Sequence, residues 1–212
     1  LIVSASKFVV VELEPCIEEK NYKINVKYCK NKEEMENLSK GTVKDGVMIH
    51  SPDGKTVYST KISTLRGEYK EDKENKNRLR LWVKSDFVPL PDDIFQERLY
   101  CVQWMRKKPS GKGDEYQFRA ITSDDLEREQ KVINFVSKNL SDWQNKGYIP
   151  DMEIEKGDET ERLYRERGWT HWHHLFNARQ LLMCGLIKIN LGLIDNNVDS
   201  LTIYFNRLLD WS

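Results

Sequence analysis

The first 121 residues of the chain are a succession of short β-rich stretches separated by turn residues. Runs of this kind are typical of strands, and they occur in FVVVEL (8–13), KINVKYC (23–29), RLRLWVKS (78–85), RLYCVQWMRK (98–107) and YQFRAI (116–121). The pairs Asp45-Gly46 and Asp53-Gly54 divide residues 42–60 into a tight meander, because such pairs accept the positive φ of hairpin turns. Residues 68–78 lack apolar periodicity and are predicted to form a mobile loop.

The hydrophobic period changes at Thr122, where helical spacing replaces the short strands. Thr122 and Asp125 form a pattern like a capping box, and the helix that they start is predicted to end at Gly147. The apolar stripe of this helix consists of Leu126, Ile133, Val136, Leu140 and Trp143. An extended acidic linker is expected to follow at 148–159.

Asn177 and Gln180 form a second pattern of this kind and predict another helix. Its apolar face consists of Leu181, Leu182, Gly185, Leu186 and Ile189. A third helix is predicted at roughly 198–211. Strands followed by helices favour an α+β fold, with an N-terminal antiparallel β-ribbon or sheet at 1–121 and a helical part at 122–212.

Composition restricts the classes of function. The 34 basic and 34 acidic residues cancel, so any binding to nucleic acid must come from local patches. The four cysteines have no C-x-x-C spacing, which argues against a disulfide framework and favours a reducing, cytoplasmic setting. No run approaches the ~18 apolar residues of a membrane span, so a soluble protein is expected. Because the chain begins at Leu1 and ends in a helical pattern, we expect it to be a piece of a longer protein.

The stretch RGWTHWHHLFNARQLL, residues 167–182, combines histidines, tryptophans and arginines ahead of an apolar helix. His171 and His174 would share one helix face, while His173 would point elsewhere. Zinc normally needs a third or fourth ligand, and none lies nearby at motif spacing. The histidines either hold a metal or cap and solvate a helix entrance; the second interpretation is favoured, and no metal is predicted.

Trp169 and Trp172 also allow two interpretations. They form either a packing seam between the linker and a helix or a platform on which bases stack, and packing is favoured. Cys184 is either a nucleophile near the histidines or a small buried hydrophobe inside the helix, and the second is favoured.

The PSGKGD turn at 109–114 is basic, and its cations could engage phosphates or be solvated residues of a turn. These cations are Arg106, Lys107, Lys108 and Lys112. The GKG sequence at 111–113 has no helix after it, so it does not form a phosphate loop closed by a helix N-terminus.

The stretch at 167–182 resembles a signature of large bacterial and archaeal adenine-specific DNA methyltransferases that carry a DUF1156 domain and a zinc ribbon. Three further stretches, YQFRAITSDDLEREQKV, GYIPDMEI and IKINLGLIDNNVDSLTIYFNRLLDWS, are similar to segments that flank it in that family. GTVKDGVMIHSPDG looks like the ribbon segment of the family. The resemblance is strong from about residue 115 onward and loose before it.

The chain also departs from the family. His50, Ser51, Pro52, Asp53 and Gly54 stand where the family has zinc-ligating cysteines, so the ribbon is degenerate and is predicted to hold no zinc. Neither the glycine-rich loop for S-adenosyl-L-methionine (F-x-G-x-G) nor the catalytic [DNS]-P-P-[YFW] tetrapeptide occurs in the sequence. In the family these motifs lie upstream and downstream, so the chain resembles the region between them.

The resemblance implies a fragment of a DNA adenine-N6 methyltransferase that is inactive alone, binds no cofactor itself, and joins the rest of the methyltransferase core and DNA. S-adenosyl-L-methionine would serve the parent protein. Candidate DNA-binding residues are Arg106, Lys107, Lys108, Lys112, Arg167, Trp169, His171, Trp172, His173 and Arg179. The arginines at 167 and 179 and the Trp/His cluster could instead anchor this region to the methyltransferase core, and anchoring is favoured for them. The alternatives are a freestanding nucleic-acid-binding module and a structural or protein-interaction domain.

Overall fold

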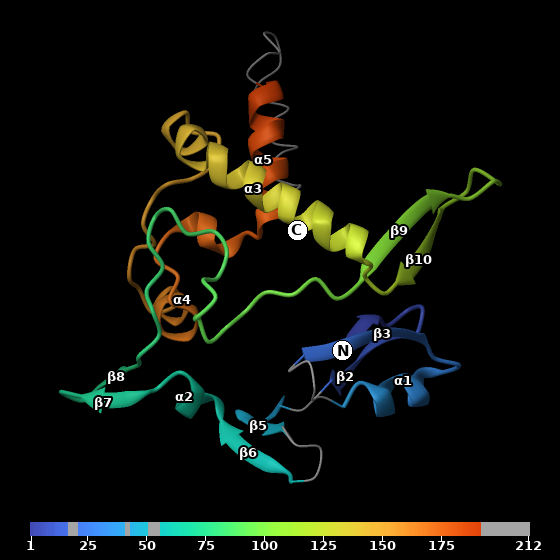
Figure 1. Ribbon diagram of the computed structural model, residues 1–212, viewed down its shortest axis with the longest axis horizontal. Helices are drawn as coiled ribbons and strands as arrows, with labels where there is room; N and C mark the ends of the chain where they lie inside the picture. Colours follow the sequence, from blue (N-terminus) through green and yellow to red (C-terminus); the bar gives the residue numbers. More distant parts are fainter. Residues whose placement is uncertain (17–20, 41–42, 51–55, 192–212) are drawn as a thin grey trace. The chain divides into compact units, whose positions relative to one another are not determined.

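The computed structural model describes residues 1–16, 21–40, 43–50 and 56–191 of the chain (Figure 1). The predicted turn at Asp53-Gly54 and the predicted helix at 198–211 lie outside the described residues. Antiparallel sheets and helices follow one another along the chain, which confirms the predicted α+β class. Among the described helices, none combines the length and apolar character needed to cross a membrane.

The described strands pair in four antiparallel sheets. The first sheet contains β1 (Ile2–Ser4), β2 (Val9–Cys16) and β3 (Asn21–Tyr28), and the second contains β4 (Val43–Lys44), β5 (Val47–His50) and β6 (Tyr58–Lys61). The two remaining sheets are hairpins, β7 (Tyr69–Glu71) with β8 (Glu74–Lys76) and β9 (Val102–Lys107) with β10 (Asp114–Arg119). Asp45 and Gly46 have φ of 50° and 74° between β4 and β5, which confirms the first predicted hairpin turn.

The helices are α1 (Lys32–Leu38), α2 (Ile62–Leu65), α3 (Ser123–Asn145), α4 (Glu161–Arg167) and α5 (Ala178–Leu191), with a 3₁₀ turn, η1 (Trp172–Leu175), before α5. The chain divides into two compact units, Leu1–Glu68 with Arg98–Leu126 and Tyr69–Glu97 with Glu127–Ser212. Segment 69–97, which the sequence analysis placed in the N-terminal part, therefore belongs to the same unit as the C-terminal helices.

The first unit is built on the β1–β2–β3 sheet. Val10, Cys29 and Met35 form its buried cluster, so α1 packs against the sheet through Met35. Tyr28 attaches the β9–β10 hairpin to the rest of this unit, because its hydroxyl accepts a hydrogen bond from the Phe118 amide (2.7 Å) and lies 3.1 Å from the Phe118 carbonyl. One tyrosine side chain thus links the hairpin to the β1–β2–β3 sheet, with which it shares no strand pairing among the described residues.

Two of the sequence-based predictions in segment 68–85 are wrong. Residues 68–78 contain the β7–β8 hairpin, whose turn residues Asp72 and Lys73 have φ of 49° and 70° and whose strands are joined by a Glu71–Lys76 ion pair. Residues 78–83 have no regular secondary structure and pair with no described strand. Instead the Trp82 amide donates to the Gly168 carbonyl at 2.8 Å, so this segment docks on a turn rather than in a sheet.

The predicted helices α3 and α5 are confirmed, and together they form the core of the second unit. Asn177 and Gln180 exchange backbone-to-side-chain hydrogen bonds of 2.9 and 3.0 Å, which is the predicted capping box. The core consists of Phe87, Val136, Leu140, Trp143, Ile149, Ala178 and Leu181. A Cβ on Gly185 would lie 2.5 Å from the Trp143 ring, so the absence of a side chain there lets the ring pack against α5.

Some predicted core positions are exposed. Leu126 begins the predicted stripe of α3 but is 49% exposed, and Leu186 of α5 is 39% exposed. Leu126 lies in the first turn of its helix, one residue from the point where the chain passes between the two units. Helical spacing therefore identified most of the buried face of each helix but not the exposure of Leu126 and Leu186.

Helix α4 was not predicted, and Gly168 ends it. This glycine has a φ of 75° and its amide donates to the Tyr164 carbonyl at 2.9 Å. A Cβ at Gly168 would lie 2.2 Å from the carbonyl oxygen of Arg80, a backbone atom with little freedom to move. Gly168 thus serves both as a left-handed helix cap and as the point where segment 80–83 approaches the turn.

We expect Gly168→Ala to destabilise the chain more than Gly147→Ala. Both glycines belong to the second unit and have positive φ (75° and 71°), but nothing lies within 4 Å of a Cβ at Gly147. The left-handed conformation costs an alanine about 1–2 kcal/mol at either site, and the clash with Arg80 adds about 1–3 kcal/mol at Gly168. Urea unfolding followed by tryptophan fluorescence measures the difference, and equal losses would contradict the close approach.

Candidate nucleic-acid interface

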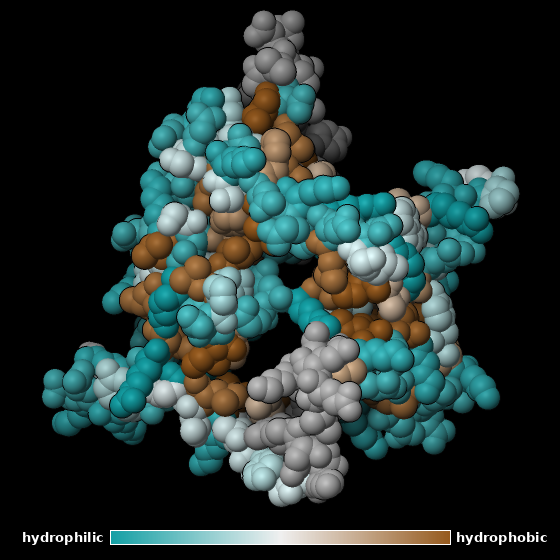
Figure 2. Space-filling model, in the orientation of Figure 1, coloured by the Kyte–Doolittle hydropathy of each residue, from teal (hydrophilic) through white to brown (hydrophobic). Residues whose placement is uncertain are grey.

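The β9–β10 hairpin is a two-stranded ribbon whose connecting loop projects beyond both strands (Figure 1). Gly111 and Gly113 have φ of 71° and 79°, and the loop is closed by a hydrogen bond from the Lys108 amide to the Gly113 carbonyl. The end of the ribbon is strongly hydrophilic on the face seen in Figure 2. The four predicted cations Arg106, Lys107, Lys108 and Lys112 are all exposed there, so the structure brings them together.

One acidic side chain partly neutralises this end of the ribbon. Glu115 accepts a hydrogen bond from Arg106 at 2.7 Å, and the side chain of Arg106 remains 67% exposed. The pKa of Glu115 is lowered mainly by Arg106, with further contributions from Lys108 and Lys7. Lys7 lies before β2 and was not among the predicted cations, so positive charge around the ribbon comes from two parts of the first unit.

Trp104 was also missed by the sequence analysis. It lies opposite Gln117 in the ribbon and is 54% exposed, with the Arg119 guanidinium 5.8 Å from its ring. Arg119 is held in place by Asp125, which accepts two hydrogen bonds from its guanidinium at 2.6 and 2.9 Å. The alternation in VQWMRK placed Trp104 and Arg106 on one face of a strand, and that signal would have found this residue.

The second unit holds its candidate residues in a different environment. His171, His173 and His174 lie around η1 and are 8%, 0% and 2% exposed. Their ring centroids lie 4.4–5.6 Å apart. The predicted capping is present, because His171 and His174 form a capping box at η1, but the histidines are not solvated, since they are buried beneath segment 82–86.

The hydrogen bonds fix the proton on His174. Its Nδ1 accepts from the backbone amides of Thr170 (3.2 Å) and His171 (3.3 Å), so this nitrogen carries no proton. Its Nε2 therefore donates to the Val83 carbonyl at 3.2 Å. Burial, together with a smaller contribution from the neighbouring histidines, lowers the pKa of His174 to about 4.

The ring protons of His173 and His171 are also fixed by their hydrogen-bond partners. His173 Nε2 donates to the Asp86 carbonyl (3.1 Å), which leaves Nδ1 to accept from Gln144 at 3.4 Å. The Thr170 hydroxyl donates to the Trp82 carbonyl (2.5 Å), so it accepts from His171 Nδ1 at 2.8 Å. His171 and His173, predicted as DNA contacts, thus serve to dock segment 82–86, because both rings are buried, both nitrogens of His173 have partners within the chain, and Nδ1 of His171 contacts Thr170.

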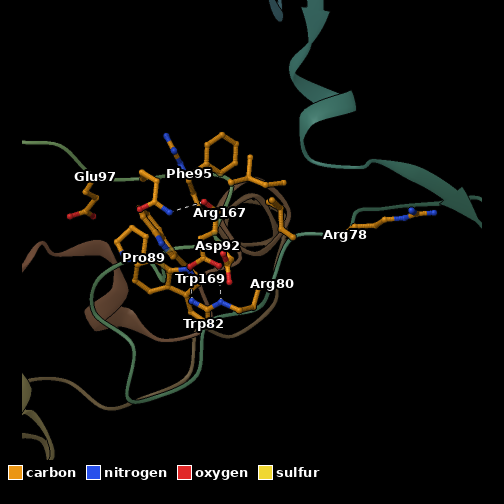
Figure 3. A pocket seen from close by; sticks show the side chains of 13 residues that line it. Arg78, Arg80, Trp82, Pro89, Asp92, Phe95, Glu97, Arg167 and Trp169 are labelled. Atoms are coloured by element: carbon orange, nitrogen blue, oxygen red, sulfur yellow. Dashed lines mark hydrogen bonds and ion pairs between the residues drawn. The ribbon is translucent and has the colours of Figure 1, made fainter. Parts of the chain in front are cut away.

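Arg167 and Trp169 reach the surface at a pocket of about 270 Å³ in the second unit (Figure 3). The Arg167 guanidinium lies 5.5 Å from the Phe95 ring centroid and 5.8 Å from that of Trp169. Trp169 is half-buried and meets Trp82 edge to face at 6.3 Å, which agrees with its predicted packing role. Phe95 was missed, since nothing in the pattern of the loop at 86–97 distinguishes it.

Arg80 forms the floor of the pocket with its own counter-ions. It donates to both oxygens of Asp93 (2.8 and 2.7 Å) and to Asp86 (2.5 Å), and it lies 5.9 Å from the Trp82 ring. The hydrogen bond with Arg80 is the main cause that lowers the pKa of Asp93. Arg80 is therefore neutralised and serves to hold the loop at 86–93, so the available positive charge in the centre of the pocket is Arg167.

Two further predicted residues lie outside this pocket. Arg179 donates to Glu129 at 2.6 Å and so joins α5 to α3, which makes it a structural ion pair. Trp172 is 37% exposed, so the prediction of core packing does not hold for it.

Cys184, predicted as a buried hydrophobe, is half-buried, and desolvation raises the pKa of its thiol.

Within the part of the chain that the structure describes, no group of three or more His, Cys, Asp or Glu side chains is placed to hold a metal ion. The buried histidines explain this for η1, because both nitrogens of His173 and His174 already have hydrogen-bond partners. The degenerate ribbon residues from Ser51 to Gly54 lie outside the described residues.

No protein-family model matches the sequence, and comparisons with curated proteins and with solved structures find no similar chain. Functional inference therefore depends on the two surfaces described above, the ribbon end and the Arg167 pocket, and on the motif resemblance.

Stability should fall as the pH is lowered from about 6.5 to 4. In the unfolded chain His174 has its ordinary pKa of 6.5, but in the folded chain it is about 4. The unfolded state therefore binds more protons in this interval, so the contribution of His174 is complete above pH 6.5 and is lost on acidification. The whole shift corresponds to about 3 kcal/mol.

Urea unfolding at several pH values between 7.5 and 4 measures this slope. The His174→Asn variant should be less stable at pH 7.5 and should show a shallower slope, because an amide does not titrate. A residual slope is expected from His173, whose pKa burial also lowers. The same slope in the variant and in the unchanged chain would rule out His174 as a source of the pH dependence.

Proposed function

We propose that the chain binds DNA through the end of the β9–β10 ribbon. The observation that carries this proposal is the clustering of Arg106, Lys107, Lys108 and Lys112 at one projecting, exposed end of a two-stranded ribbon. Among the residues that the structure describes, Arg106 has an ion pair with Glu115, while no ion pair involves the three lysines. Cations without internal partners are available to phosphates.

The shape of the ribbon supports DNA over other polyanions. The major groove of B-DNA is about 12 Å wide and admits a two-stranded β-ribbon. A ribbon in the groove carries its loop cations past the phosphates at the edges, while side chains on its faces meet base edges. Trp104 and Arg119 occupy one such face, where an exposed ring and a guanidinium lie together.

The resemblance of residues 167–182 and their neighbours extends the proposal to the parent protein. We propose that the chain belongs to a DNA adenine-N6 methyltransferase and lies between its cofactor-binding and catalytic motifs. An enzyme that modifies a base must hold the duplex while that base leaves the stack. The ribbon would supply part of the contacts that hold the duplex, and S-adenosyl-L-methionine would bind to the rest of the methyltransferase core.

The isolated chain is expected to show no binding of S-adenosyl-L-methionine and no methylation of DNA, because the sequence contains neither motif. Isothermal titration with S-adenosyl-L-methionine and transfer of a labelled methyl group to duplex DNA measure the two activities. Micromolar affinity for the cofactor would contradict the proposed place of the chain between the motifs.

Replacement of Lys108 and Lys112 by alanine should weaken binding to a paired duplex and reduce its dependence on salt. Each lost phosphate contact lowers the slope of log K against log salt by about 0.9, so the double variant should lose about 1.8. Fluorescence anisotropy with a labelled duplex at several salt concentrations measures both quantities. The stability of the variant should be unchanged, since both side chains are exposed.

A Lys131→Ala, Lys138→Ala double variant provides the control with the same change of charge. Both lysines are exposed on α3 and belong to the second unit. This variant should retain the affinity and the salt slope of the unchanged chain. Equal effects of the two double variants would show that binding follows net charge rather than the ribbon, and would remove the basis of the proposal.

A further inference from the structure

The pocket beside Arg167 has the chemistry of a nucleotide site. Its wall combines two aromatic rings, Phe95 and Trp169, with the aliphatic surface of Pro89 and Ile94. In Figure 3 the labelled members Arg167, Phe95, Trp169, Pro89 and Asp92 gather around it, whereas Arg78 and Glu97 extend away. Its volume, about 270 Å³, is just below the range of ~300–1,000 Å³ that is typical of small-ligand pockets.

Arg167 is the cation that a ligand would meet. Its side chain is exposed at the end of α4, and the two rings hold the guanidinium by cation–π contacts. Among the described residues, its guanidinium contacts these two rings and forms no ion pair. A guanidinium held by rings keeps its N–H groups free for a phosphate, which it can bind through two parallel hydrogen bonds.

The remaining charges in the pocket select against a simple anion. Asp93 and Asp86 accept hydrogen bonds from Arg80. Asp92 also lines the pocket and is exposed, and it forms no hydrogen bond or ion pair with the described residues. A free carboxylate repels an isolated phosphate. It favours a ligand that places a hydrogen-bond donor there, such as the exocyclic amine of a base.

We propose that this pocket binds a nucleotide whose base has an exocyclic amine, with the phosphate on Arg167 and the base against Trp169 and Phe95. The nucleotide is either free or an unstacked residue of a DNA strand, since both present the same groups. Binding of a nucleotide within a DNA strand rests on the proposed function, whereas binding of a free nucleotide does not. The pocket lies in the second unit and the ribbon in the first, so the two proposals are tested by different variants.

Titration of the full chain with AMP, UMP and inorganic phosphate, followed by tryptophan fluorescence or calorimetry, tests the site. AMP should bind more tightly than UMP, which lacks the amine, and more tightly than phosphate, which lacks the base. Arg167→Ala should weaken AMP binding about 10-fold or more, as expected for loss of a bidentate contact. Arg162→Ala, which removes an exposed arginine of α4 outside the pocket, should leave it unchanged.

A second variant keeps the test independent of folding. Asp92→Asn retains the shape of an exposed loop residue and should reduce the preference for AMP over UMP, while binding of inorganic phosphate stays equal or rises. The proposal is overturned if AMP binds no better than inorganic phosphate, or if Arg167→Ala binds AMP as well as Arg162→Ala does.

Two duplexes distinguish the sources, one fully paired and one with a single unpaired adenosine. If the nucleotide comes from the strand, the unpaired adenosine increases affinity and Arg167→Ala removes that increase. If it is free, AMP binds but the unpaired adenosine adds nothing. The Lys108, Lys112 double variant separates the proposals: full duplex binding by that variant, with intact AMP binding, would reject the ribbon and keep the pocket.

Discussion

The second unit depends on the docking of residues 80–86 against the turn that follows α4. Gly168 permits the contact, because any side chain there would meet the Arg80 carbonyl, and its own carbonyl accepts from the Trp82 amide. The carbonyls of Trp82, Val83 and Asp86 then accept from Thr170, His174 and His173. Neutral side chains thus take the place of a neighbouring strand for these three carbonyls, which have hydrogen-bond partners without a sheet.

This docking also sets the geometry of the pocket. Arg167 and Trp169 flank Gly168, and Trp82 meets Trp169 from the docked segment. Arg80 anchors the loop that carries Phe95 through its ion pairs with Asp86 and Asp93. A change that frees segment 80–86 would therefore disturb the pocket as well as the core. Loss of binding in a variant of this region indicates a binding role only where stability is retained.

The sequence predicted features that depend on local chemistry. The α+β class, the Asp45-Gly46 turn and the Asn177 capping box follow from φ preferences and hydrogen bonds within a few residues. It did not predict features that depend on distant partners. Residues 78–83 look like a strand but dock on Gly168, and His173 gains its partners from Asp86 and Gln144. The Arg167 pocket was not predicted: Arg167 and Trp169 are near neighbours in the sequence and were named as candidate DNA contacts, but Phe95 reaches them only through the fold.

The neutral net charge determines how the proposed binding would work. With 34 charges of each sign, the chain as a whole does not attract DNA from a distance, and at physiological salt a charge is screened beyond about 8 Å. The lysines at the ribbon end would then act only after close approach, which makes the fit of the ribbon to a groove as important as its charge. Selectivity for one ligand over another would come from shape and from side chains that contact bases rather than phosphates, such as Trp104 on the ribbon and Asp92 in the pocket. A surface of this kind suits a module whose DNA is delivered and held by a larger protein, because weak long-range attraction is no handicap when the duplex is already close.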